Sequence, residues 1–405
     1  MILRRQLPAY SPLSAASIRQ AIVHGLGPGM DGQADLSEAL ESKYAADQAV
    51  LLGSGTQALQ VAIELAMRQV GDAAVALPAF TCFDVATAAV GARARIRFYD
   101  LDPSTLAPDL RSLERVLKRG TRIAVITPLY GFPVDWDAVA ELLARYGAIA
   151  VEDAAQGDHA DWRGSILGSL GPISVLSFGR GKGWTGGSGG ALLVREQPPW
   201  GDLREALTEL SAMRSRRARE VRVLGALAAQ WALGRPDYYA IPHALPWLQL
   251  GETVYRDPVS PHRMTRAASA CLAATRPASA REAATRRVTA AVLLEAIGSA
   301  SHVRPIRPLL GGTPGYLRLP LRLAHGLAGF PQLAEATRLG FARSYPAILP
   351  AIPQIRPRVD DRTAAWPGAE ELVRTLCTAP THSLLTAEER SELIQHLQAY
   401  ERAAR

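Results

Sequence analysis

Short apolar runs alternate with longer helical segments through the first half of the chain, and this alternation restricts the fold more than any other feature. The apolar runs are typical of buried strands, and the intervening segments are long enough to be helices that connect parallel strands. We therefore predict an α/β fold whose large domain has a mostly parallel central sheet covered by helices on both faces. The predicted strands are VLLGSG (50–55), AAVALPAF (73–80), ARIRFYDLD (94–102), RIAVITPLYG (122–131), AIAVEDAAQ (148–156), ISVLSFGRGKG (173–183) and GGALLV (189–194), and helices are predicted over 36–48, 56–70, 83–92 and 135–147.

The chemically distinctive residues of this half follow the predicted strands. A glycine turn, Gly53-Ser54-Gly55-Thr56, comes after the first strand, and Asp153 comes at the end of AIAV. Ser177 and Lys182 follow in the strand and glycine loop after that. Ligands of open α/β sheets bind beyond the carboxyl ends of the strands, so we expect these residues to lie close together.

Gly55 and Thr56 stand where a strand runs into a helix. Backbone N–H groups at a helix N-terminus bind anions, and glycine lets a phosphate approach the backbone closely. A plain turn with a threonine cap explains the same residues equally well. The turn does not match the dinucleotide fingerprint, and FGRGKG (178–183) does not match a phosphate-binding P-loop.

Lysine is nearly absent from the chain. Only Lys43, Lys118 and Lys182 occur, so 42 of the 45 basic residues are arginine. A lysine amine can lose its proton and a guanidinium effectively cannot, so a lysine kept in such a chain points to amine chemistry. Lys43 and Lys118 lie in helical segments and are expected at the solvated surface, whereas Lys182 stands between glycines. The pI of about 9.5 does not indicate nucleic-acid binding, because the arginines are spread along the chain without a recognisable module.

Asp153, Ser177 and Lys182 together suggest a site for pyridoxal phosphate (PLP). A carboxylate at the end of a buried strand can pair with a protonated pyridine nitrogen, which keeps the ring an electron sink. Taken alone, Asp153 is as well explained as the cap of the next helix. Ser177 offers a hydroxyl to a phosphate, and Lys182, 29 residues after Asp153, offers the amine that binds the cofactor.

The second half of the chain is organised differently. Residues 203–300 are mostly helical, and the last hundred residues mix a strand over 316–324, a helix near 332–343 and a terminal helix from Thr386 onward. We predict a large domain over 1–262, with an atypical helical segment at about 203–260, and a small α+β domain over 263–405. Within that segment a basic run (214–222) meets an apolar run (223–234). It is expected to pack on the large domain or at a dimer interface; the alternative is peripheral contact of 214–234 with a membrane surface.

Targeting signals are not evident. The N-terminal residues contain no apolar stretch of useful length, and no run approaches the ~20 apolar residues of a spanning helix. Cys82, Cys271 and Cys377 fit neither a disulfide framework nor a zinc pattern. A cytoplasmic enzyme without a metal is therefore expected.

Several of these segments, taken together, resemble the DegT/StrS family of PLP-dependent sugar aminotransferases, which have the fold-type I architecture. The resemblance implies a homodimeric enzyme that uses glutamate or glutamine to aminate a keto sugar, usually a nucleotide-linked one. It is carried by SGTQAL (54–59), LPAFTCFDVATAAVGARARIRFYDLDPSTL (77–106), PLYGFPVDWDAVAELLARYGAIAVEDAAQ (128–156), GSLGPISVLSFGRGKGWTGGSGGALLV (168–194), and further runs between 316 and 400.

The resemblance also implies roles for single residues. Lys182 matches the Schiff-base lysine and Asp153 the partner of the pyridine nitrogen; Gln156 matches the residue near the phenolic oxygen of the cofactor. Ser177, Gly55 and Thr56 match the phosphate site. The chain departs from the family at four places. Cys82 replaces the aromatic that stacks on the ring, so that Phe83 or Phe80 is expected to stack instead. Pro128 and Ser188 replace the usual His and Glu, and the asparagine that reaches the partner's phosphate site is not evident in GETVYRDP (251–258).

We therefore expect a PLP-dependent aminotransferase that transfers an amino group, from glutamate or glutamine, to a keto sugar or related carbonyl compound in polysaccharide or specialised-metabolite biosynthesis. Two alternatives remain. One is another PLP reaction on the same scaffold, although Lys182 argues against a sugar dehydratase, in which histidine would be expected. The other is a non-catalytic relative that serves as a binding or regulatory module.

Overall fold

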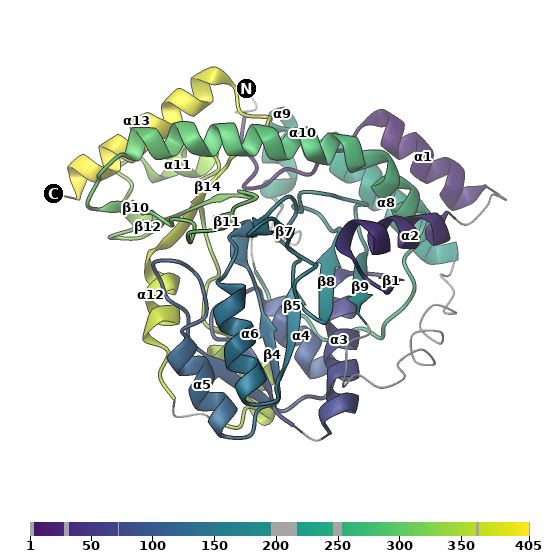
Figure 1. The fold of residues 1–405 in the computed structure, drawn as a ribbon. Coiled ribbons are helices and arrows are strands. Elements are labelled where there is room, and N and C mark those ends of the chain that lie inside the picture. Colours follow the sequence, from purple (N-terminus) through teal and green to yellow (C-terminus); the bar gives the residue numbers. More distant parts are fainter. Residues whose placement is uncertain are drawn as a thin grey trace.

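A seven-stranded sheet forms the centre of the large domain. The computed structural model describes residues 4–27, 32–71, 73–195, 217–245, 253–361 and 364–404. The strand order is β1-β9-β8-β5-β4-β2-β3, and among these strands only β9 runs antiparallel to its neighbours. The predicted α/β fold with a mainly parallel sheet is thus confirmed (Figure 1). The strands are β1 (Gln48–Leu52), β2 (Val75–Pro78), β3 (Ile96–Tyr99), β4 (Ile123–Ile126), β5 (Ile149–Asp153), β8 (Ile173–Ser177) and β9 (Gly190–Val194).

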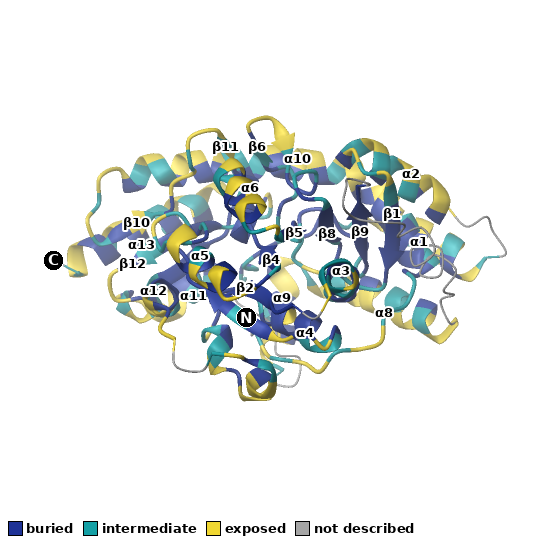
Figure 2. Cartoon of the chain, turned by 60° about the horizontal axis from the view of Figure 1, so that its bottom comes forward, coloured by how far each residue is buried: buried dark blue, intermediate teal, exposed yellow. Residues whose placement is uncertain are grey.

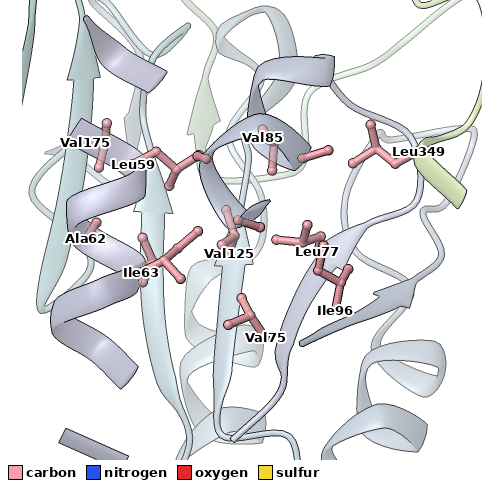
Figure 3. Packing of buried hydrophobic residues seen from close by; sticks show 14 of the residues in the cluster. Leu59, Ala62, Ile63, Val75, Leu77, Val85, Ile96, Val125, Val175 and Leu349 are labelled. Atoms are coloured by element: carbon pink, nitrogen blue, oxygen red, sulfur yellow. The ribbon is translucent and has the colours of Figure 1, made fainter. Parts of the chain in front are cut away.

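Helices cover both faces of this sheet because alternate strand residues are apolar on each side. One face packs on α3 (Gly55–Val70) and α4 (Phe83–Gly91), and Figure 3 shows Leu59 and Ile63 of α3 among the strand side chains. The other face is covered by α2 (Gln33–Tyr44), α5 (Leu110–Lys118) and α6 (Trp136–Arg145). The strands are accordingly buried while the outer faces of the helices are exposed (Figure 2).

The long helix α10 (Arg266–Ile297) connects the central sheet to a second layer of structure (Figure 1). Its first half packs on the large sheet through Ala268 and Leu272, and its end packs through Leu293 and Ile297 on an antiparallel sheet of order β10-β12-β14-β13. Residue 263, the predicted domain boundary, lies just before this helix, and that division of the chain stays a proposal. The strands of the second sheet are β10 (Val303–Pro305), β12 (Leu319–Leu323), β13 (Ala342–Arg343) and β14 (Leu376–Ala379).

The remaining C-terminal elements are short apart from the last helix. The predicted terminal helix is α13 (Ala387–Ala403), and Thr386 caps it by accepting a hydrogen bond from the Glu389 backbone. The other elements are α11 (Leu333–Arg338), α12 (Pro367–Thr375), the 3-10 turns η1 (Leu129–Gly131), η3 (Leu327–Gly329), η4 (Leu349–Ala351) and η5 (Pro353–Arg358), and a small sheet of β11 (Gly312–Thr313), β6 (Asp161–Trp162) and β7 (Ser165–Ile166).

Three local predictions differ from the structure. The helix expected over 36–48 is α2, which ends at Tyr44 because Ala45 takes a left-handed conformation (φ 48°) and Gln48 begins β1. The helix expected near 332–343 ends at Arg338, and its last residues form strand β13 instead. Lys43 is not the fully solvated surface residue expected: it is half-buried, its amine lies 4.9 Å from the Trp184 ring centre, and burial lowers its pKa.

The atypical segment contains two described helices, α8 (Arg217–Leu233) and α9 (Pro236–His243). Residues 203–216 and 246–252, including the start of the basic run, lie outside the described residues. Glu220 fastens α8 to the large domain by accepting hydrogen bonds from the backbone N–H groups of Arg266 (2.9 Å) and Ala267 (3.1 Å) at the start of α10. Beside α8 lies α1 (Ala15–Leu26). None of the helices in the described ranges is long and apolar enough to span a bilayer.

Candidate active site

Asp153 is a buried carboxylate at the end of β5, 5% exposed. Its Oδ1 accepts a hydrogen bond from Ala155 N (3.2 Å), and in the described part of the chain its Oδ2 accepts one only from the Thr127 hydroxyl, at 3.4 Å. Burial raises the pKa of Asp153, while the positive charge of Lys182 opposes that rise. The charge of Lys182 thus acts on Asp153, and the roles expected for the two residues stay predictions. Among the described residues Asp153 forms no ion pair, so a buried carboxylate remains available to a cationic partner.

Lys182 stands in a tight loop between β8 and β9. Ser11 braces this loop: its hydroxyl accepts a hydrogen bond from Gly181 N (2.9 Å) and donates one to the Lys182 carbonyl (3.0 Å). Gly181 has φ of +77°, a conformation that favours glycine, and this explains why glycine precedes the lysine. Trp184 fixes the other side by donating from Nε1 to the Leu272 carbonyl of α10 at 2.7 Å.

Gly55 and Ser177 form a close contact at the N-terminus of α3. A Cβ atom on Gly55 would lie 2.5 Å from the Ser177 Cβ, so no larger residue fits there without movement. Ser54, not Thr56, caps α3 by accepting a hydrogen bond from Gln57 N (3.2 Å). The Ser177 hydroxyl therefore lies against the first turn of α3, whose backbone N–H groups favour an anion.

Cys82 and its neighbours occupy the connection between β2 and α4. The Cys82 side chain is half-exposed, yet the surrounding protein and the nearby Asp84 charge raise the pKa of its thiol to about 12. Phe80 and Phe83 are both buried in the main core cluster. Phe80 packs edge-to-face on Tyr345 (ring centres 5.2 Å apart). The Thr81 hydroxyl is buried and has no hydrogen-bond partner within the described ranges. Which aromatic ring faces a cofactor therefore remains a prediction.

Gln156 is held by two tyrosines that the sequence analysis did not single out. Its Oε1 accepts a hydrogen bond from Tyr130 N (3.0 Å), and its Nε2 donates to the Tyr345 hydroxyl (3.1 Å). The two tyrosine rings lie nearly parallel, with centres 6.4 Å apart, and the Tyr130 hydroxyl bonds to Ser344. Burial raises the pKa of Tyr345 well above its ordinary value, and the neighbouring Tyr130 adds to that rise. Both tyrosines therefore stay neutral.

The signals for these tyrosines were weak in the sequence. Tyr130 lies at the predicted end of the 122–131 strand, where a left-handed backbone (φ 58°) turns the chain within η1. Such a conformation is uncommon for a bulky residue and marks a constrained position, but the sequence does not show it. Tyr345 comes from the distant C-terminal half, and only the fold brings it to Gln156.

These groups fit pyridoxal phosphate. A buried carboxylate, without an ion pair among the described residues, lies near the only lysine of the loop, and a serine hydroxyl lies against the first turn of α3, a close approach that glycine at residue 55 allows. A pyridine nitrogen, an aldehyde and a phosphate are the three groups that such a set would hold.

Comparison with known proteins agrees with this interpretation. The model of the DegT/DnrJ/EryC1/StrS aminotransferase family matches residues 26–398. A segment of 165 residues is 33% identical to L-glutamine:2-deoxy-scyllo-inosose aminotransferase of Streptoalloteichus tenebrarius, and the match covers 39% of each protein. A segment of 126 residues is 33% identical to a pleiotropic regulatory protein of Geobacillus stearothermophilus, and this match covers 31% of this chain and 34% of the relative. Each match thus spans well under half of the relative's length.

The overall shape is shared with solved structures. The crystal structure of the sugar aminotransferase CalS13 from Micromonospora echinospora superposes with a TM-score of 0.72 at 20% sequence identity, covering 98% of this chain and 99% of that one. At this identity the likeness establishes the fold.

Proposed function

The chain belongs to the DegT/DnrJ/EryC1/StrS aminotransferase family, and from that membership we propose that it is a PLP-dependent aminotransferase whose acceptor is a keto sugar or a related cyclic ketone. The donor that we propose is glutamine or glutamate. The observation that carries the proposal is the convergence of the buried Asp153 carboxylate and Lys182 at the ends of β5 and β8. A carboxylate and a lysine so placed are the two groups that amine transfer through PLP requires.

We assign the other residues by their positions. Asp153 would pair with the pyridinium nitrogen, which keeps the ring positively charged. Ser177, Gly55 and Thr56 would hold the phosphate, because the hydroxyl and the first N–H groups of α3 lie together. Gln156 would face the phenolic oxygen from a position fixed by its two tyrosine contacts.

Lys182 would do the proton chemistry. When bound, PLP supplies the carbonyl that accepts the donor amine and a ring that delocalises the electron pair left on the donor carbon. The freed Lys182 amine would take the α-proton of the donor and deliver a proton to the cofactor carbon. Water would release the donor as a keto acid and leave its amino group on the cofactor. In the reverse sequence the acceptor ketone would take up this amino group, and the water consumed in the first half would be released again. Residues 179–183, held by Ser11, would keep the amine over the reacting carbon.

A substrate screen tests this proposal. Protein incubated with glutamine or glutamate should lose its near-visible absorbance, and the correct ketone should restore it. A panel of inososes, nucleotide-linked keto sugars and aromatic ketones would identify the acceptor class. Loss of absorbance with a donor but no recovery with any ketone would favour another PLP reaction; protein that takes up no PLP would favour the regulatory alternative, for which the Geobacillus regulatory relative is the supporting observation.

We also propose a cytoplasmic homodimer. Three free cysteines are in keeping with a reducing compartment.

An apolar surface for the second subunit is provided by α1 and the adjoining α8. Its exposed residues are Ile22, Val23 and Leu26 on α1 and Val221 on α8. The alternative occupant is an anionic membrane, because Arg222 is exposed beside Val221. Sedimentation with and without anionic vesicles distinguishes the dimer from the membrane-bound protein. A dimer that does not co-sediment with the vesicles would exclude membrane binding.

A further inference from the structure

Gly183, the residue after Lys182, lies directly against a buried ion pair. Its acidic member, Asp158, stands in the turn after β5, and its basic member, Arg286, stands on α10. A Cβ atom at residue 183 would lie 2.2 Å from Asp158 Oδ2 and 2.8 Å and 2.9 Å from the two terminal nitrogens of Arg286. The carboxylate and the guanidinium are themselves 3.3 Å apart. The ion pair therefore fills the space that a side chain at residue 183 would need.

This ion pair is only partly satisfied by hydrogen bonds. The Arg286 side chain is 1% exposed and that of Asp158 13%. In the described part of the chain Arg286 donates a single side-chain hydrogen bond, from Nη2 to Asp158, whereas its Nε and Nη1 and the Asp158 Oδ1 are buried without a partner. A buried pair with such gaps recovers little of the cost of leaving water, and apolar residues of similar volume are often as stable or more so. Stability alone therefore does not account for this pair.

Neighbouring side chains hold the Asp158 carboxylate in place. The Ser279 hydroxyl donates to Asp158 Oδ2 at 3.1 Å and is also hydrogen-bonded to His159 Nε2 at 3.2 Å. Burial lowers the pKa of the His159 ring, so this ring, 3.7 Å from Asp158 Oδ1, is neutral at neutral pH. Within the described ranges Arg286 thus supplies the one permanent positive charge that pairs with Asp158.

The helix α10, which carries the guanidinium, also holds the two residues that follow Gly183. Trp184 Nε1 donates to the Leu272 carbonyl at 2.7 Å, and Thr275 Oγ1 donates to the Thr185 carbonyl, also at 2.7 Å. This helix extends from the second sheet to the large sheet (Figure 1). The ion pair and these two hydrogen bonds together attach the second half of the loop to α10.

We propose that Asp158 and Arg286 are positioning residues, whose ion pair fixes the backbone at Gly183 and, through it, the place where Lys182 presents its amine. The proposal rests on the proposed function, since it concerns the lysine that would react with the cofactor. Because the pair occupies the place of a side chain at residue 183, movement of the pair moves the peptide unit next to Lys182. A misplacement of about 1 Å can lower a rate about a hundredfold, even when the altered residue is far from the chemistry.

The donor half of the reaction tests this role. The rate at which glutamine or glutamate removes the near-visible absorbance is measured against donor concentration, which separates the limiting rate from the half-saturating concentration. We expect Arg286→Met to lower the limiting rate by about tenfold to a hundredfold. The half-saturating concentration should stay unchanged, because a side chain that is 1% exposed is not available to the donor. Arg286→Lys, which keeps the charge, should recover part of the rate.

Arg195→Met is the matched control. Arg195 is also buried, and its guanidinium donates to the Gly171 and Gly168 carbonyls, each at 2.6 Å. It follows β9 at the end of the sheet opposite to the Lys182 loop, since Val194 pairs with Ile173 at the start of β8. The control variant should melt at a lower temperature, as Arg286→Met should, yet keep the limiting rate of the wild type. A purely structural role for Arg286 would make the two variants alike in rate.

Gly183→Ala tests the contact without removing a charge. The added Cβ would meet the Asp158 carboxylate, so the limiting rate should fall by about tenfold or more. The fall should be smaller in an Asp158→Ala background, because the two changes act on one contact. Gly225→Ala, whose Cβ meets nothing within 4 Å, should leave the rate unchanged.

Hydrogen exchange of residues 179–186 follows the loop without the cofactor. In PLP-free protein Arg286→Met should speed exchange in this segment relative to the rest of the chain, and Arg195→Met should not. A normal limiting rate in both Arg286→Met and Gly183→Ala would overturn the positioning role. If the protein never acquires the near-visible absorbance but loop exchange depends on Arg286, the proposed function fails and the hold on the loop stands. If the absorbance forms and neither loop exchange nor limiting rate depends on Arg286, only this inference fails.

Discussion

Gly55 at the start of α3 abuts Ser177 at the end of β8, so closely that a Cβ atom on Gly55 would lie 2.5 Å from the Ser177 Cβ. The contact joins α3 to the central strand β8. It lies at the carboxyl ends of the parallel strands, where β5 also ends at Asp153. A side chain at residue 55 would displace Ser177 or the first turn of α3, the two groups that we propose hold the phosphate.

Gly55→Ala should therefore weaken PLP binding by about tenfold or more and, through overpacking, lower the free energy of unfolding by about 1–3 kcal/mol. Titration of the variant with PLP and urea denaturation measure the two effects. Gly225→Ala on α8 is the control, because nothing lies within 4 Å of its added Cβ. A variant that binds PLP like the wild type would remove the phosphate site from this position.

Gln156 and Tyr345 should be energetically coupled. Gln156→Leu leaves the buried Tyr130 N–H and the Tyr345 hydroxyl without their partner, which should cost about 1–3 kcal/mol of unfolding free energy, whereas Tyr345→Phe should cost about 1 kcal/mol. In a double-mutant cycle the two losses should not add, because they share one hydrogen bond. Strict additivity would mean that the bond from Gln156 to Tyr345 contributes nothing.

Glu220 should anchor α8 to the large domain. Glu220→Ala removes the acceptor for two backbone N–H groups at the start of α10, so we expect a loss of about 0.5–2 kcal/mol in unfolding free energy. Glu141→Ala serves as the control, since its carboxylate pairs only with Arg145 on the exposed face of α6. Equal stability of both variants would show that α8 is not fastened through this contact.

Glu401 should make the protein sensitive to acid. Burial alone would raise the pKa of its carboxyl, but hydrogen bonds from His302 and Ser301 lower the pKa from 4.5 to about 2. A depressed pKa in the folded state stabilises the protein above pH 4.5, and that contribution is lost as the pH falls toward 2. Glu401→Gln should be less stable at neutral pH and lose less stability over this interval. We would measure the free energy of unfolding of the wild type and of Glu401→Gln against pH. Two parallel profiles would contradict the depressed pKa of Glu401.

The sequence predicted those parts of the site that local pattern determines. Asp153 and Ser177 end buried strands, and parallel strands bring their carboxyl ends to one edge, so their meeting followed from the alternation alone. Lys182 stood out because glycines surround it and lysine is rare in this chain.

The parts that the sequence did not predict depend on distant contacts. Ser11 holds the Lys182 loop from 171 residues away, and Tyr345 reaches Gln156 from 189 residues away. The sequence predicts Lys43 as a solvated surface residue of a helix, but in the folded chain its amine lies over the Trp184 ring. No local periodicity records such contacts, because they arise only when separate elements pack.

The central claim is that Lys182 binds PLP opposite Asp153, and the near-visible absorbance of the purified protein tests it most directly. Wild-type protein supplied with PLP should absorb in this region and be bleached by borohydride, with the cofactor then fixed to the peptide that contains Lys182. Lys182→Ala should show neither property, and Asp153→Asn should bind PLP but lose most of its transaminase activity. A wild-type protein that stays colourless with excess PLP, or a Lys182→Ala variant that is still bleached and labelled like the wild type, would contradict the account.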